Sequence, residues 1–248
     1  MSNGIVNINL DKDLISIFVH KPYNFKKDTV PFDERVKQIH KIENEIDYKF
    51  CKIVRTKQTH SNNVKIINED NIDEVVEDTD GLITNLKNVA LLSLVADCQW
   101  ILLYDKKNKV IGNIHSGWRG TLSRISTHAL NIMVEEFSSD PADIKIYLSP
   151  SIHQCCFEVS EEIKCLFEKE FKEINMKNII KLWEFKDNEQ KYFIDMVELN
   201  KRVLLNLWIK KENIIISDKC TVCNSEKIHS YRKDKPNEWR NILLISIK

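Results

Sequence analysis

The segment NIHSGWRGTL, residues 113–122, concentrates residue types that can do chemistry. The chain has only five glycines in 248 residues. Three of them lie in this segment or directly before it: Gly112, Gly117 and Gly120. This clustering predicts unusual backbone, because glycine adopts conformations that other residues avoid. Beside the glycines stand His115, which can bind a metal or move a proton, and Arg119, which can bind an anion.

A cysteine is predicted to lie beside this histidine. The runs WILLYD and VIGNIH predict two strands, and the polar loop between them predicts a β-hairpin whose turn starts at Asp105 and ends at Asn108. Antiparallel partners keep a constant sum of residue numbers, so this turn places Cys98 opposite His115. Their Cβ atoms would then be about 5 Å apart.

A thiol beside an imidazole has two common chemical uses. Cys98 can be a nucleophile with His115 as its base, or both can be ligands of a metal ion. The structural alternative is a buried cysteine next to a hydrogen-bonded core histidine. We favour a functional pair, because His115 ends a strand just before a predicted helix N-terminus, where anions are favoured. Trp118 would either line a pocket for a flat ligand or anchor the packing.

The elements that must position these residues follow from the pattern of apolar residues. The expected strands cover residues 14–20, 50–56, 63–68, 89–97, 100–105, 110–115, 144–149 and 213–217. The expected helices cover residues 122–137, residues 163–174 after the N-cap Ser160, and a stretch from Asp195 to Trp208 with Glu198 placed for a capping box. Strands outnumber helices without regular βαβ alternation. This favours an α+β fold, with mixed β-sheets flanked by helices in one domain over residues 1–248.

Composition and charge exclude several classes of protein. Lys plus Arg and Asp plus Glu both number 37, so net charge does not favour binding to nucleic acid or to an anionic membrane. No apolar run approaches the roughly 20 residues that span a bilayer, and the N-terminus does not resemble a signal peptide. We therefore expect a cytoplasmic protein, a monomer or weak homo-oligomer, that binds neither nucleic acid nor membranes.

The seven cysteines form no repeating framework, which predicts free thiols and ligands rather than disulfides. Cys155 and Cys156 are interpreted as a buried structural pair. Cys220 and Cys223 offer half the ligands of a zinc ribbon, and no second pair of this spacing exists. No independent structural metal or redox site is therefore expected there.

Six segments of the chain, taken in order, point to a known family. They are KQTHSNNV (57–64), DGLITN (80–85), ADCQWILLYD (96–105), IHSGWRGTL (114–122), SPSIHQCCFEV (149–159) and HSYRKDK with Arg240 beyond it (229–240). Together they resemble the multicopper polyphenol oxidase or laccase-domain family, also called the YfiH family. The resemblance runs from about residue 50 to the C-terminus. It implies a YfiH-like fold of the cysteine-hydrolase type and the activity of a purine nucleoside phosphorylase that also deaminates adenosine.

The resemblance also implies site residues. In that family the histidine of Q-x-H, the cysteine of A-D-C and the histidine of H-x-G-W-R-G bind one zinc ion, which carries over to His60, Cys98 and His115. Two imidazoles and a thiolate suit Zn²⁺, with Cu²⁺ as an alternative, and leave a fourth position for water or substrate. Arg232 and Arg240 fall in the family's terminal arginine block, where they would hold phosphate.

Three positions depart from the family pattern. Gln99-Trp100 stands where proline is usual, and Ser149 and Trp239 stand where glycine is common. All three ligands are kept, so the departures bear on pocket shape and substrate preference rather than on the metal.

The favoured function is a zinc enzyme that acts on a small nucleoside, namely inosine, adenosine or methylthioadenosine, together with phosphate. Arg119, Arg232 or Arg240 and the helix N-terminus after Gly120 would supply the phosphate site, and Trp118 would stack on the base. The first alternative is a metal-free hydrolase with Cys98 and His115, acting as an amidase, a deamidase or an editor of peptidoglycan precursors. A copper-dependent polyphenol oxidase ranks last, because one three-ligand site cannot hold the several coppers of a laccase.

Overall fold

The computed structural model describes residues 4–26, 32–72, 75–184, 190–237 and 239–248. The first sheet has the strand order β1-β2-β16-β8-β4-β6, and β3 also pairs with β16. Its strands are β1 Ile5–Asn7, β2 Leu14–Val19, β3 Phe25–Lys26, β4 Lys52–Thr56, β6 Val75–Val76, β8 Val89–Val95 and β16 Trp239–Ile247. The pairs that β4 makes with β6 and β8 are parallel and the others are antiparallel, so the sheet is mixed.

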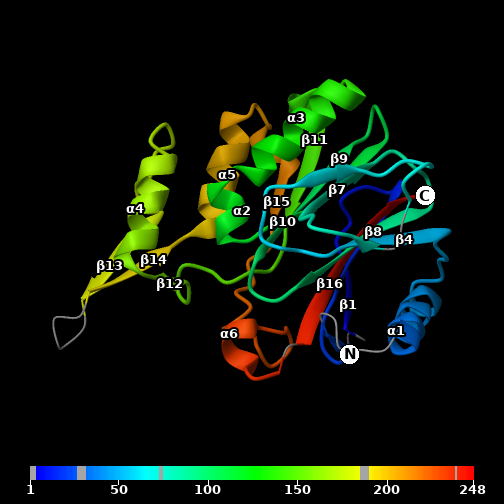
Figure 1. Cartoon of the computed structure of the whole chain (residues 1–248), viewed down its shortest axis with the longest axis horizontal. Helices are drawn as coiled ribbons and strands as arrows, with labels where there is room; N and C mark the ends of the chain where they lie inside the picture. The colour runs from blue at the N-terminus through cyan, green and yellow to red at the C-terminus, as the bar shows by residue number, and fades with distance from the viewer. Residues whose placement is uncertain (1–3, 27–31, 73–74, 185–189, 238) are drawn as a thin grey trace.

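The second sheet has the strand order β15-β11-β9-β10-β7-β5 and is also mixed. Its strands are β5 Val64–Ile66, β7 Gly81–Thr84, β9 Gln99–Asp105, β10 Val110–Ser116, β11 Ile144–Leu148 and β15 Ile214–Ile216. A small third sheet, β12-β14-β13, is formed by β12 Glu158–Val159, β13 Ile180–Glu184 and β14 Gln190–Ile194. Figure 1 shows this sheet and α4 (Glu161–Glu170) projecting to one side of the two larger sheets.

The two large sheets pack face to face, and helices cover their outer faces (Figure 1). Residues of both sheets form the central core, among them Phe18, Leu91, Trp100, Leu102, Ile111 and Leu243. The other helices are α1 Phe32–Glu45, α2 Trp118–Leu122, α3 Ile125–Phe137, α5 Met196–Asn206 and α6 Tyr231–Asp234, with 3₁₀ turns at Pro141–Asp143 and Lys211–Asn213. Helix α1 packs on the outer face of the first sheet, and α3 and α5 pack on that of the second.

The expected α+β fold with mixed sheets flanked by helices is confirmed. Every expected strand is present within two residues of its expected bounds. The central strand β16 was not predicted, although its buried apolar residues pair with both β2 and β8. No helix within the described residues has the length and apolar character needed to cross a membrane.

Two helix predictions need correction. The stretch expected as one helix over residues 122–137 is broken into α2 and α3 at Arg124, whose φ is 60°. The N-cap predictions for α4 and α5 are confirmed: Ser160 accepts from the Ile163 amide, and Asp195 accepts from the Glu198 amide. The capping box expected at α5 is not formed, because the Glu198 carboxylate accepts from Lys201 and Arg202, and the Asp195 amide donates to the Ile179 carbonyl oxygen. Trp208 does not belong to the apolar face of α5, since it lies beyond the helix and is 82% exposed.

The hairpin register differs from the prediction by two residues. Asp105 pairs with Val110, because the Asp105 carboxylate accepts hydrogen bonds from the Lys107 and Asn108 amides and closes a four-residue turn. His115 therefore lies opposite Trp100 instead of Cys98. A shift of two residues keeps side chains on the same face of a strand, so the thiol still lies on the face that carries the imidazole.

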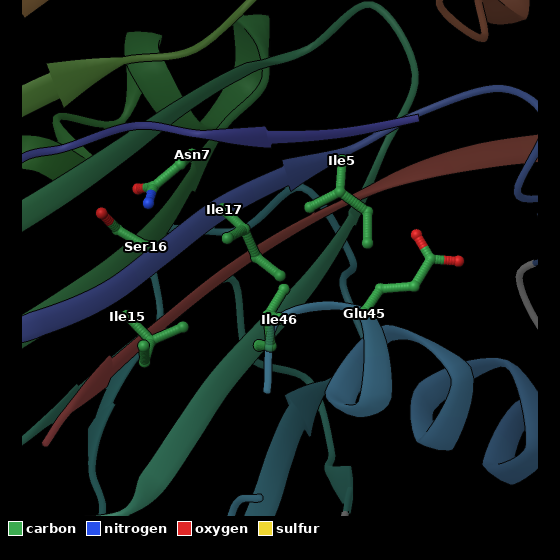
Figure 2. Close-up of a pocket in the computed structure, with 7 residues that line it drawn as sticks. All are labelled: Ile5, Asn7, Ile15, Ser16, Ile17, Glu45 and Ile46. Atoms are coloured by element: carbon green, nitrogen blue, oxygen red, sulfur yellow. The ribbon is translucent and has the colours of Figure 1, made fainter. Parts of the chain in front are cut away.

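A pocket of about 490 Å³ lies between α1 and the strands β1 and β2, on the outer face of the first sheet. Figure 2 shows its lining residues: Ile5, Asn7, Ile15, Ser16, Ile17, Glu45 and Ile46. Glu45 is the ionisable residue among them, and its carboxylate already accepts a hydrogen bond from the Tyr23 hydroxyl. The lining of this pocket therefore lacks the paired ionisable groups that acid–base catalysis needs.

Candidate functional site

Three potential metal ligands meet at the end of the hairpin. His60 lies in the loop after β4, Cys98 directly precedes β9, and His115 lies near the end of β10. Their ligand atoms all lie within 4.8 Å of one another, and Cys98 Sγ is 3.9 Å from His60 Nε2. His115 is buried and the other two are half-buried, so the cluster opens to solvent on one side. The structure thus brings together all three predicted ligands.

Gly117 and Gly120, in the segment of residues 113–122, are needed because a side chain would not fit there, not because their backbone conformation is unusual. Gly117 has an ordinary φ of −64°, and the glycine with a positive φ is Gly4. A Cβ added at Gly117 would lie 2.9 Å from His60 Cδ2 and 3.3 Å from Cys98 Sγ. A side chain at this position would therefore displace the ligands. Similarly, a Cβ at Gly120 would lie 3.0 Å from the carbonyl oxygen of Ser61, in the loop that carries His60.

Asp80 fixes the two histidines relative to each other. Its carboxylate is completely buried and accepts hydrogen bonds from the amides of Thr59 (3.1 Å), His60 (3.1 Å) and Ser61 (2.8 Å). It also accepts a 2.7 Å hydrogen bond from His115 Nδ1. This bond leaves His115 Nε2 to face the cluster, the arrangement by which carboxylates orient metal-binding histidines. The pair Asp80-Gly81 predicts a turn with Asp80 close to the site, but the sequence does not predict these hydrogen bonds, because the four partners of Asp80 are distant along the chain or are backbone groups.

The charges of the cluster are strongly coupled. Burial alone raises the pKa of the Cys98 thiol, but the charge and hydrogen bonds of His115 and His60 outweigh it and lower the pKa to about 6. Burial alone lowers the pKa of His115, but Cys98 and Asp80 together raise it to about 9. Burial would raise the pKa of Asp80, yet its bonds to His115 and Ser61 hold it well below the usual range. Each of the two side chains thus favours the charged form of the other.

The donor set fits a zinc ion. Bond lengths of about 2.3 Å to sulfur and 2.0–2.1 Å to nitrogen place tetrahedral S and N ligands roughly 3.5 Å apart, close to the 3.9 Å between Cys98 Sγ and His60 Nε2. Two imidazoles and one thiolate also match the ligand preference of Zn²⁺. Zinc binding would release the proton that Cys98 and His115 share, because a thiolate and a neutral imidazole are the forms that bind a metal ion. The side open to solvent provides room for a fourth ligand.

Two adjoining pockets flank the cluster. The first, of about 310 Å³, is the more aromatic and basic, and its lining includes Trp118, Arg119, Phe157, Tyr231, Arg232 and Lys235. The second, of about 330 Å³, is lined by Gln58, His60, Leu94, Ala96, Cys98, His115, Tyr231 and Arg240. Tyr231, His60 and Cys98 line both, so a ligand in either pocket would reach the cluster.

The predicted arginines divide between these pockets. Arg119 lies 4.1 Å from the centre of the Trp118 ring, and Arg232 donates a 2.8 Å hydrogen bond to the carbonyl oxygen of Cys156. Both line the first pocket, whereas Arg240 lines the second and lies 5.5 Å from the centre of the Tyr231 ring. The helix N-terminus expected after Gly120 is not there, because Gly120 lies within the short helix α2.

Sequence reasoning missed several pocket residues. Tyr231 and Lys235 lie in the segment HSYRKDK, beside the predicted phosphate-binding residue Arg232. Their closeness to Arg232 in the sequence was the one signal that could have identified them. Phe157 directly follows the cysteine pair, and its aromatic side chain in a loop gave no sign of function. Trp118 lines the first pocket and also packs against the core around α4, which confirms its packing role.

Comparison with known proteins places the chain in a family. A family model described as multi-copper polyphenol oxidoreductase laccase matches residues 24–248. The chain belongs to this family. A purine nucleoside phosphorylase of Borreliella burgdorferi is 31% identical over 238 residues, covering 92% of this chain and 93% of its own length. An adenosine deaminase, RL5, of an unknown prokaryotic organism is 31% identical over 198 residues, covering 76% of this chain and 70% of its own length.

Solved structures of the family agree in fold. YlmD from Geobacillus stearothermophilus superposes with a TM-score of 0.87 at 19% identity, covering 100% of this chain and 97% of its own. The hypothetical protein YfiH from Bacillus licheniformis gives 0.84 at 21% identity, covering 99% and 97%. The resemblance inferred from the six segments is thereby confirmed, together with the YfiH-like fold.

The role of Asp80 generates a prediction. Replacing Asp80 with Asn removes the charge that orients His115 and weakens the bonds that hold the His60 loop. We expect affinity for zinc to fall by about 10–100-fold, measured by competition with a chromophoric chelator. The matched control is Asp78→Asn. The exposed Asp78 carboxylate accepts a hydrogen bond from the Thr59 hydroxyl, in the same loop, but does not contact His115. Equal affinities in the two variants would contradict this role.

Proposed function

We propose that this protein is a zinc-dependent purine nucleoside phosphorylase that also deaminates adenosine. One observation carries the proposal: two members of the cluster of His60, Cys98 and His115, namely His60 and Cys98, line a pocket that is also lined by aromatic and basic side chains. A purine base needs flat apolar surfaces, and phosphate needs cations, so the pocket offers partners for both substrates. The names of relatives at about 30% identity support the same pair of activities.

The metal would contribute Lewis acidity at its open coordination position. The chain's own groups then have separate tasks. Asp80 holds the proton on His115 Nδ1 and so keeps Nε2 directed at the cluster. Cys98 supplies a negative charge that is already favoured before any metal binds, since its pKa is lowered to about 6. Gly117 leaves the space that these three side chains occupy.

The first pocket suits the two substrates. Trp118, Phe157 and Tyr231 would stack on or enclose the nucleoside. Arg119, Arg232 and Lys235 would bind phosphate, with the guanidinium groups able to hold two oxygens at once. The carboxylate of Asp97 also lines this pocket, and its two oxygens accept hydrogen bonds from the Thr221 hydroxyl and the Arg232 amide.

A second candidate is a metal-free Cys–His hydrolase. The observation that favours it is the position of the Cys98 sulfur within 4.8 Å of the His115 ring nitrogen, because a neighbouring imidazole lowers the pKa of a thiol and activates it as a nucleophile. This candidate gives no role to His60, whose ring also faces Cys98. We therefore rank it below the zinc enzyme, and rank copper-dependent phenol oxidation below both.

The proposed reactions differ in their need for phosphate. We expect inosine to release its base only when phosphate is present, and adenosine to form inosine without phosphate. Arg119→Met should raise the KM for phosphate by about 10–100-fold through loss of a charged hydrogen bond, and should affect deamination far less. Chromatography of the products measures both, and Lys107→Met in the hairpin turn serves as the control.

Base release without phosphate would contradict phosphorolysis, and equal effects of Arg119→Met on the two reactions would contradict its phosphate role.

The roles of Cys98 can be separated by substitution. Asp is another anionic ligand that zinc accepts, so Cys98→Asp should keep part of the zinc and a weak activity. If Cys98 were the nucleophile, activity would disappear completely while the fold persisted. Zinc content and product formation are measured together, with Cys51→Ser as a control at an exposed cysteine. A mass shift on Cys98 from trapped substrate, in metal-free wild-type protein, would favour the hydrolase instead.

A further inference from the structure

We propose that a second zinc ion, structural rather than catalytic, is held by Cys155, Cys156, Cys220 and Cys223. The four sulfur atoms all lie within 4.8 Å of one another, and the cluster shares no residue with the one formed by His60, Cys98 and His115. All four cysteines are free thiols. Four converging thiols offer the complete ligand set of a closed tetrahedral zinc site.

The sulfur positions match a single ion. Zinc–sulfur bonds of about 2.3 Å place tetrahedral sulfurs roughly 3.8 Å apart. The Sγ atoms of Cys155 and Cys223 are 3.7 Å apart, and those of Cys156 and Cys223 are 3.5 Å apart. A multi-iron cluster would hold its thiolates further apart, on opposite sides of the cluster. The spacing therefore favours one ion with four thiolates.

Backbone hydrogen bonds bring the two cysteine pairs together. Ser151 forms a parallel bridge with Cys220, and the Thr221 amide donates a 2.9 Å hydrogen bond to the Ser151 carbonyl. The His153 amide also points at Cys220 Sγ, at 3.5 Å, as donors do around metal-bound thiolates. The site is thus built into the chain fold, because the loop after β11 and the loop after β15 are already joined here.

No metal site was expected at Cys220 and Cys223 because the chain has no second pair of the same spacing, but the structure places Cys155 and Cys156 beside them. Adjacent cysteines do not have the spacing of a zinc ribbon, so no sequence pattern groups Cys155 and Cys156 with Cys220 and Cys223. The interpretation of Cys155 and Cys156 as a buried pair is also wrong, since Cys155 is exposed and Cys156 is half-buried. Contact between the loops, rather than spacing along either one, forms the cluster.

The proposed ion would stabilise one wall of the first pocket. Arg232 donates a hydrogen bond to the carbonyl oxygen of Cys156, and its own amide donates to Asp97 Oδ2 at 2.7 Å. Thr221, between the two cysteines of the second pair, donates to Asp97 Oδ1 at 2.6 Å. Cross-linking the two loops would therefore fix Arg232 and Phe157 in the pocket. The four thiolates would occupy all four coordination positions of the zinc ion. No position would remain for substrate, so the role of this ion is structural.

The test counts metal ions in the full-length protein, purified with reductant. We expect two zinc ions per chain in the wild type and one in Cys223→Ser. The control Cys165→Ser, at an exposed cysteine outside the cluster, should keep both. His60→Ala should lose the other ion. After replacement with Co²⁺, His60→Ala should retain the intense absorption of a tetrathiolate site, and Cys223→Ser should lack it.

A second measurement uses the wild type alone and does not depend on how a variant folds. Mass spectrometry after alkylation should find Cys155, Cys156, Cys220 and Cys223 protected, and a chelator should expose them. Cys51 and Cys165 should react under both conditions. Equal zinc content in Cys223→Ser and Cys165→Ser would overturn the proposal. A disulfide joining Cys223 to Cys155 or Cys156 in the reduced preparation, or alkylation of the four without chelator, would also overturn it.

Discussion

The buried carboxylate of Asp80 is the constraint on which the site depends. A charged group without solvent is costly to bury unless it is fully hydrogen-bonded, and here the amides of three successive residues and the His115 ring meet that need. The same bonds attach the loop that carries His60 to the end of β10. These hydrogen bonds to one carboxylate therefore stabilise its buried charge, select the nitrogen that His115 directs at the cluster, and determine where the His60 imidazole lies.

The sequence predicted much of this arrangement because strand periodicity tolerates certain errors. The register of the hairpin was wrong by two residues, yet Cys98 and His115 remained on one face, whereas an error of one would have separated them. The adjoining strands and the caps Ser160 and Asp195 were also predictable, since they depend on local pattern. His60 was found only through the family resemblance, because a loop histidine carries no periodic signal.

Features that depend on contacts between distant segments could not be predicted. A glycine is required at position 117 because the side chains of His60 and Cys98 approach it closely, not because its backbone conformation is unusual. The four-cysteine cluster arises where the loops after β11 and β15 meet, at a bridge that involves Cys220. The two clusters proposed to bind metal are linked through the pocket wall, where Asp97 precedes Cys98 in the chain and accepts hydrogen bonds from Thr221 and Arg232. The catalytic and structural sites would thus share one scaffold.

The most direct test of the central claim, that Asp80 arranges a zinc site, is a crystal structure with diffraction data from both sides of the zinc absorption edge. We predict an anomalous peak about 2.0–2.3 Å from His60 Nε2, Cys98 Sγ and His115 Nε2, with His115 Nδ1 still bonded to Asp80. Zinc-replete crystals with no peak between these three side chains, or with His115 turned so that Nδ1 no longer contacts Asp80, would contradict it.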